Sequence, residues 1–170
     1  MANTFSADDQ PTAVVRVDNL AAVRADNLQF AEERAAAVFG TIGARVVWID
    51  EDSAVRTGIM APFTLALVDA EQIAGQTRLF MDALGFAAPR VRRAYVFYDR
   101  IQALNVRSPP SIPSILGDVM AHELGHLLLP LPGHSADGIM RPGVNIKLVP
   151  TETFTKSQAR EILSRLRQVP

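Results

Sequence analysis

Residues 115–129 constrain the fold most, because a helix over this segment would be apolar on almost every face. A helix that is hydrophobic all round is buried in the interior of a protein. It must end before Pro130, because proline clashes with the preceding turn and disfavours helix at the residue before it. The rest of the chain must therefore fold around this segment, whose large apolar residues are Ile115, Leu116, Val119, Met120, Leu124, Leu127 and Leu128.

The remaining pattern predicts one sheet and further helices. Four β-rich runs predict strands, at residues 12–17, 45–49, 62–69 and 93–99. Helices are expected at residues 28–39, at residues 71–89 and after Thr155. Thr155 and Gln158 form a capping box, and Phe154 is placed to pack against Ala159. We therefore expect an α/β (α+β) fold, a single mixed sheet packed on helices.

The length of the chain fits one domain. No repeat or long linker divides residues 1–170, of which residues 1–12 look like a loose N-terminal segment. Trp48 is expected in the core, and Arg92 and Arg93 at a solvated strand entrance. The absence of cysteine excludes a disulfide framework, a cysteine zinc finger and a thiol nucleophile.

The net charge of the chain predicts binding to neither nucleic acid nor a membrane. Seventeen basic and eighteen acidic residues give a net charge of -1, too small to attract either polyanion. No apolar run approaches the ~20 residues that cross a bilayer, and the first residues lack the pattern of a signal peptide. We expect a monomer, secreted or periplasmic if a signal peptide has been removed.

His122 and His126 are spaced to bind one metal ion. On a helix these residues are separated by about 40° around the axis and about one turn along it. Both imidazoles therefore reach one ion, and the geometry suits zinc. Glu123 lies beside this stripe, where a carboxylate acts on a metal-activated water without occupying a coordination position.

Chance is the alternative explanation of this short pattern, and the composition weighs against it. The chain has three histidines, of which the third, His134, lies eight residues after His126. In an otherwise apolar helix, each unpaired polar group costs about 1 to 3 kcal/mol. A metal ion compensates the histidines directly, so zinc is favoured over chance.

These residues resemble the metzincin superfamily of zinc endopeptidases, and within it the matrixin-like members. HELGH at residues 122–126 matches the first half of their zinc motif, HSAD at residues 134–137 resembles the matrixin ending, and GIMRP at residues 138–142 looks like the methionine turn. The last helix also stands where such proteins place their closing helix. The resemblance implies that His122, His126 and His134 bind Zn²⁺ and that Glu123 is the general base.

Two features depart from the metzincin pattern. Leu129 stands where metzincins have a glycine, and His134 comes two residues later than their third histidine. Pro130, Pro132 and Gly133 supply other turn chemistry, so we interpret the difference as a two-residue expansion of the turn. The segment from residue 134 to 140 is also two residues shorter than in typical matrixins.

The resemblance also implies surroundings for the metal. Met140 would form the methionine turn beneath the zinc, and residues 141–147 would wall the pocket for the side chain after the scissile bond. An extended peptide would lie along a strand edge above the helix. Asp137 is either a hydrogen-bond acceptor for an imidazole or a turn residue.

The expected function is therefore zinc-dependent hydrolysis of peptide bonds in a peptide or protein substrate, with Glu123 taking the proton of the activated water. The alternative is a catalytically silent, zinc-stabilised peptide-binding module, which has no use for Glu123. A third interpretation keeps the enzyme but takes its last ligand from a carboxylate, with Glu152 as the candidate.

Overall fold

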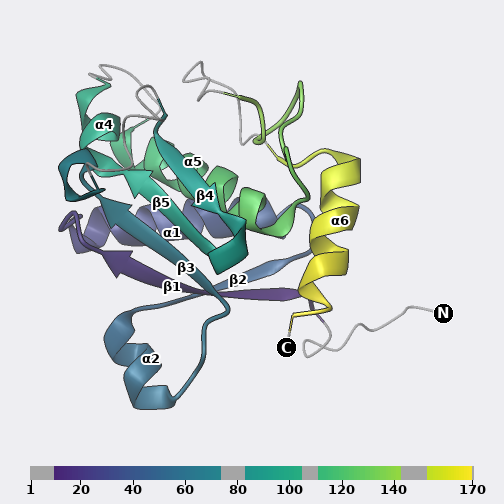
Figure 1. The fold of residues 1–170 in the computed structure, drawn as a ribbon, viewed down its shortest axis with the longest axis horizontal. Coiled ribbons are helices and arrows are strands. Elements are labelled where there is room, and N and C mark those ends of the chain that lie inside the picture. The colour runs from purple at the N-terminus through teal and green to yellow at the C-terminus, as the bar shows by residue number, and fades with distance from the viewer. Residues whose placement is uncertain (1–9, 74–82, 105–110, 143–152, 170) are drawn as a thin grey trace.

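The computed structural model describes residues 10–73, 83–104, 111–142 and 153–169. In these ranges five strands form one sheet in the order β2-β1-β3-β5-β4 (Figure 1). β1 is parallel to β2 and β3, and β3 is parallel to β5, whereas β4 runs antiparallel to β5. The expected fold class, a single mixed sheet packed on helices, is confirmed. The strands are β1 Thr12–Asn19, β2 Arg45–Ile49, β3 Phe63–Val68, β4 Gly85–Ala88 and β5 Arg93–Phe97.

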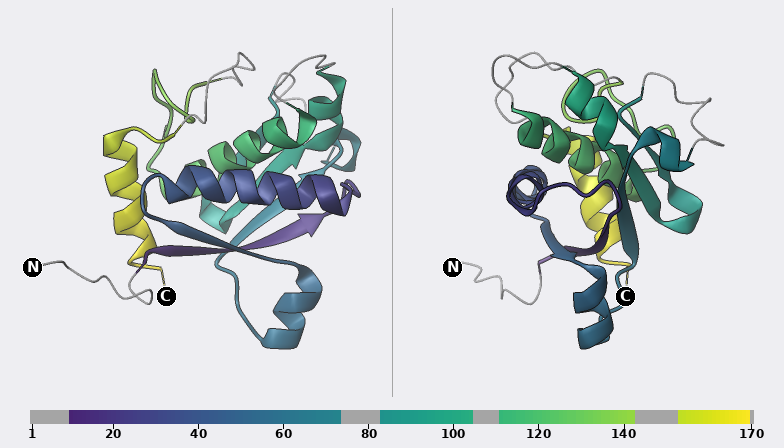
Figure 2. Two further views of the ribbon diagram at one scale, coloured as in Figure 1. Left: turned by 180° about the vertical axis from the view of Figure 1, so that it is seen from behind. Right: turned by 90° about the vertical axis from the view of Figure 1, so that its left-hand side faces the viewer.

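Two long helices, α1 (Ala25–Gly40) and α5 (Ile112–Leu128), lie side by side on one face of the sheet, and α2 (Glu51–Thr57) projects on the other side (Figure 2). Gly117 lets the long helices approach closely, because a Cβ there would stand 2.7 Å from the carbonyl oxygen of Ala31. Arg34 of α1 and Asp118 of α5 form an ion pair between the two helices. The guanidinium donates two hydrogen bonds to the carboxylate, at 2.8 and 3.0 Å. The shorter helices are η2 Ala70–Ile73, η3 Pro89–Val91, α4 Tyr98–Ala103 and α6 Lys156–Leu166.

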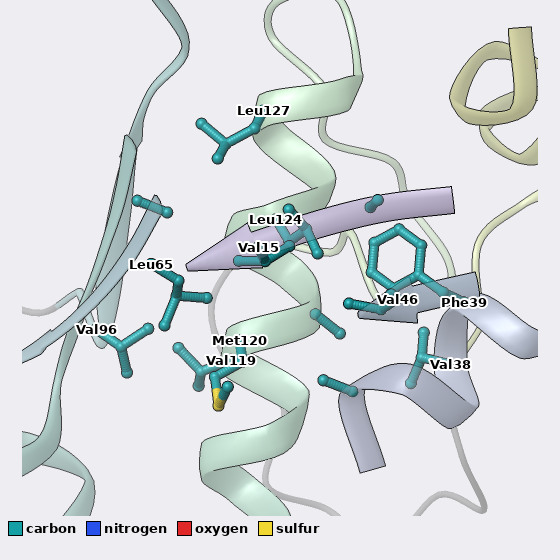
Figure 3. Close-up of a cluster of buried hydrophobic side chains, with 14 of the residues drawn as sticks. Val15, Val38, Phe39, Val46, Leu65, Val96, Val119, Met120, Leu124 and Leu127 are labelled. Atoms are coloured by element: carbon teal, nitrogen blue, oxygen red, sulfur yellow. The ribbon is translucent and has the colours of Figure 1, made fainter. Parts of the chain in front are cut away.

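The core lies between α5, α1 and the sheet (Figure 3). The α5 side chains of Val119, Met120 and Leu124 are almost completely buried and face side chains of the strands. Fully burying one such side chain contributes roughly 1.5 to 3 kcal/mol, so α5 is held firmly. The prediction that the apolar helix is buried is confirmed.

The helix predicted at residues 71–89 is wrong at residues 83–88, and residues 74–82 lie outside the described ranges. Only the short η2 is helical at its start, and Gly85–Ala88 is strand β4. Pairing with β5 decides this conformation, and a local pattern cannot reveal a distant partner. α2 was not predicted either; the side chain of Asp50 caps it by accepting from the backbone N–H of Ser53 at 2.5 Å.

Several element boundaries differ by a few residues from those predicted. β1 continues to Asn19, α1 begins at Ala25, and α5 begins at Ile112 after the cap of Ser111. The strand predicted at 93–99 ends at Phe97, where α4 takes over.

The start of α6 is as predicted, with both hydrogen bonds of the capping box formed by Thr155 and Gln158. Phe154, just before this cap, is buried, and its ring centroid lies 4.9 Å from that of Phe39. The C-terminal helix is therefore fixed at its first turn.

Three other side chains test the sequence interpretation. Trp48 packs against the core as expected, and its indole N–H donates to the carbonyl of Glu32 at 3.0 Å. Arg93 is not merely solvated: it pairs with Asp18 at 2.8 Å, and Arg92 occupies the turn between β4 and β5 with a φ of 51°.

None of the helices among the described residues has the length and hydropathy to cross a membrane.

Candidate metal centre and active site

Three imidazoles converge at one point beside α5. His122 and His126 lie one turn apart on α5, and His134 comes from the loop that follows. The Nε2 atom of His126 lies 3.1 Å from Nε2 of His122 and 3.1 Å from Nε2 of His134. The candidate ligand atoms of all three residues lie within 4.8 Å of one another. The structure thus brings together the three histidines that the sequence singled out.

Two of the three nitrogen separations fit a tetrahedral metal ion. Zinc binds imidazole nitrogen at about 2.0 to 2.1 Å in tetrahedral geometry, which places neighbouring ligand nitrogens about 3.3 Å apart. The two 3.1 Å separations are close to that value. Three ring nitrogens that face one another need a shared cation or proton between them, since two lone pairs repel.

The backbone of residue 139 fixes the orientation of His122. Nδ1 of His122 lies 2.7 Å from the carbonyl oxygen of Ile139. A carbonyl only accepts, so Nδ1 carries the proton and donates it. The lone pair of Nε2 is then directed toward the other two histidines, as a metal ligand requires.

Burial favours the neutral, metal-binding form of the helical histidines. Burial, followed by the charge of His134, lowers the pKa of His122, while the bond to Ile139 acts in the opposite direction. Burial, with the charges of His122 and His134, lowers the pKa of His126 to about 4. Neutral imidazole is the form that binds metals, and these residues hold it at neutral pH.

Glu123 directly follows His122 on α5 and is almost fully buried. Its side chain is 5% exposed, and its Oε2 atom has no hydrogen-bond partner among the described residues. Burial raises the pKa of Glu123 to about 8. A buried carboxyl group with an unused oxygen needs a polar partner, which a water or a metal centre beside it supplies.

The four side chains open into one cavity of about 360 Å³. β4 forms one wall, and the loop after α5 forms the other through Leu131, Pro132 and Pro142. Apart from the histidines and Glu123, the described lining residues are uncharged. The cavity brings the candidate metal centre, the candidate base and a strand edge into one space.

The loop that carries His134 packs against α5 through Met140. Met140 is fully buried, and its Sδ atom would stand 2.6 Å from a Cβ at Gly125, so the two residues are in close contact. Ser135 ties the loop to itself, because its N–H donates to the carbonyl of Met140 and its Oγ to the carbonyl of Asp137. Asp137 is exposed in this turn.

Some predicted features lie outside the described residues, namely Glu152 and the wall expected from residues 143–147. Sequence reasoning also missed three contributors: Gly85 on β4, the carbonyl of Ile139 and the side-chain amide of Gln158. The sequence indicated Gln158 only as a capping residue. The contributions of Gly85 and of the Ile139 carbonyl depend on tertiary structure.

The fold of this chain is shared with solved zinc peptidase structures. The crystal structure of archaemetzincin from Methanopyrus kandleri superposes with a TM-score of 0.62 at 13% identity, over 92% of this chain and 97% of that one. A zinc-dependent peptidase from Methanocorpusculum labreanum gives 0.61 at 15% identity, over 87% and 99%.

Archaemetzincin from Archaeoglobus fulgidus, solved in complex with malonate, gives a TM-score of 0.55 at 16% identity, over 87% of this chain and 99% of that one. At these identities the likeness shows a common fold. No family model matches the chain, and no curated protein matches its sequence.

Proposed function

We propose that this protein is a zinc-dependent endopeptidase, with His122, His126 and His134 as the zinc ligands and Glu123 as the general base. The observation that carries the proposal is the convergence of three Nε2 atoms beside a buried glutamate in one cavity. The fold shared with zinc peptidases supports it. Zinc held by three neutral imidazoles lowers the pKa of a bound water to about 7 and polarises a carbonyl group.

In this proposal Glu123 takes the proton from the attacking water and delivers it to the leaving amine. Its raised pKa, about 8, suits a group that must hold a proton part of the time. A bound cation nearby lowers that pKa and favours the carboxylate that accepts the proton.

The substrate would be a peptide or protein chain in extended conformation. β4 is the last strand of the sheet among the described residues, and Gly85, Phe86 and Ala87 line the cavity. An extended peptide can add to such an edge through main-chain hydrogen bonds. This geometry presents a peptide bond to the histidines and Glu123.

A finer assignment within the metzincins is part of the same proposal. We place the protein beside the matrixin-like members, with a two-residue expansion before His134 and Met140 in the methionine turn. Gly133, with a φ of 73°, supports the tight turn that the expansion requires. The burial of Met140 against Gly125 supports its place under the histidines.

The test compares wild type with Glu123→Gln, which keeps the shape of the side chain and removes the base. Zinc content is measured by elemental mass spectrometry, and hydrolysis is measured on a broad peptide library and on an unfolded protein. We expect about one zinc per chain in both proteins and hydrolysis by wild type alone. Glu161→Gln, which changes an exposed glutamate on α6, is the control and retains activity.

The competing function is a zinc-stabilised peptide-binding module without turnover. It predicts that wild type and Glu123→Gln both bind zinc and peptides, and that neither cleaves any member of the library. A wild-type protein that takes up no zinc at neutral pH would contradict both functions.

A further inference from the structure

Gln158 of α6 is a buried amide whose three hydrogen bonds converge on the histidine loop and its own helix cap. Its Nε2 atom donates to the carbonyl of Gly133 at 3.1 Å and to Oγ of Ser135 at 3.0 Å. Its Oε1 atom accepts from the N–H of Thr155 at 3.0 Å. Gly133 O only accepts and Thr155 N–H only donates, so these partners fix which end of the amide is which. In the described part of the chain, Gln158 and Glu123 are the buried polar side chains.

The two residues that Gln158 Nε2 contacts are the immediate neighbours of His134. His134 itself is exposed and lies outside any helix or strand, so burial does not hold its imidazole. Gly133 already lies tight against the metal centre, because a Cβ there would stand 2.8 Å from Nδ1 of His126. A small shift of the loop would therefore move His134 relative to the helical histidines.

We propose that Gln158 is a positioning residue for the third metal ligand, and that it links the docking of α6 to metal affinity. Its amide holds the backbone on one side of His134 and the side chain of Ser135 on the other. Ser135 extends the connection to Met140, whose carbonyl accepts from the Ser135 N–H at 3.0 Å. The inference rests on the proposed metal site.

The deciding variant is Gln158→Glu. Glutamate at this capping-box position still accepts from the N–H of Thr155, but a carboxylate has no N–H for Gly133 or Ser135. The matched control is Thr155→Ala, which removes the helix cap and leaves the Nε2 donor of Gln158 in place. Gln158→Glu loses the two hydrogen bonds to the loop, whereas Thr155→Ala lowers the stability of α6.

The readouts are the zinc dissociation constant, by competition with a chromophoric chelator, and the visible absorption spectrum of the cobalt-loaded protein. Gln158→Glu should weaken zinc binding by about 10- to 100-fold, the usual effect of losing a partner that orients the ligands, and should alter the cobalt bands. Thr155→Ala should lower the melting temperature without changing either readout. Equal zinc affinity and identical cobalt spectra in Gln158→Glu and wild type would overturn the inference, as would an equal loss of affinity in Thr155→Ala.

Ser135→Ala by itself keeps the inference testable if Gln158→Glu folds poorly, and where both variants fold they complete a double-mutant cycle. Ser135→Ala leaves α6 intact and removes one partner of the amide, so zinc affinity should fall by a smaller factor than in Gln158→Glu. The combined variant should bind zinc no more weakly than Gln158→Glu alone, because both changes break the same connection. Unchanged zinc affinity in Ser135→Ala would contradict the proposed role of Gln158. A loss in the combined variant equal to the product of the two single losses would contradict it as well. Failure of wild type to bind zinc would instead contradict the proposed function.

Discussion

Gly85 of β4 presses against Glu123 of α5: a Cβ built on Gly85 would stand 2.8 Å from Oε1 of Glu123 and 2.8 Å from its Cγ. The same Cβ would lie 2.7 Å from the carbonyl oxygen of Tyr95 on β5. Only glycine lets the edge strand lie this close to the candidate base. The strand and the glutamate are therefore positioned together.

Gly85→Ala should keep the zinc and lose most peptidase activity, by about 100-fold, because a displacement of a catalytic group by ~1 Å costs this much. Steady-state kinetics and zinc content measured on the same sample check this. The control is Gly40→Ala, whose added methyl would meet no atom within 4 Å and which should retain activity. Full activity in Gly85→Ala would show that Glu123 does not depend on this contact.

His134→Ala should weaken zinc binding far more than Asp137→Ala, because His134 has its Nε2 atom 3.1 Å from that of His126. A supporting role for Asp137 would limit its loss to about 10- to 100-fold. Zinc dissociation constants of both variants, and of Glu152→Ala, decide between the ligand sets. Retention of wild-type affinity by His134→Ala, with a large loss in Glu152→Ala, would move the third ligand to the carboxylate.

Removing the metal should lower thermal stability. A ligand that binds only the folded state at 100 times its dissociation constant stabilises by about 2.7 kcal/mol, or roughly 5 to 11 °C for a protein of this size. Differential scanning fluorimetry before and after chelation, with zinc added back, measures the shift. His134→Ala should show a much smaller zinc-dependent shift, and an equal shift in that variant would point to zinc bound elsewhere.

Glu32 on α1 makes the stability of the protein depend on pH. Burial, followed by the negative charge of Asp50, raises the pKa of Glu32 to about 7 from its ordinary 4.5. A group with a raised pKa in the folded state contributes its full stability below pH ~4.5 and loses it as the pH rises through ~7. Glu32→Gln should therefore raise the melting temperature relative to wild type at pH 8 and much less at pH 4.5.

Glu33→Gln, a change at the exposed neighbouring position, is the control for the Glu32 prediction. Its melting temperature should follow that of wild type across the same pH range. If the two glutamine variants show the same pH dependence, the partial burial of Glu32 has no measurable effect on stability.

The features predicted correctly from sequence are those set by neighbours along the chain. The period of the apolar residues marked α5, the spacing of His122 and His126 placed two imidazoles on one side of it, and the capping box marked the start of α6. Each depends on side chains within about one helical turn of one another. The convergence of His134 also followed from a short loop, because few residues separate it from His126.

The features missed depend on partners far away in the chain. Gly85–Ala88 becomes a strand through its pairing with β5, and its small residues give little local sign of this. The contact of Gly85 with Glu123, and the contacts of Gln158 with Gly133, form only once β4 and α6 are docked. Sequence thus singled out the three histidines that converge at the candidate site, whereas the contacts that support them required the tertiary structure.

β4 stands at the end of the sheet in the described part of the chain, and an edge that can receive a peptide can also receive the same edge of another copy. Here the edge strand has only four residues, and Pro89 directly after it has no N–H to extend the pairing. Shortness limits strand exchange between molecules and, in the proposed function, leaves room for a few substrate residues. The same segment would then set both resistance to aggregation and substrate capture, and lengthening β4 to tighten peptide binding would increase self-association.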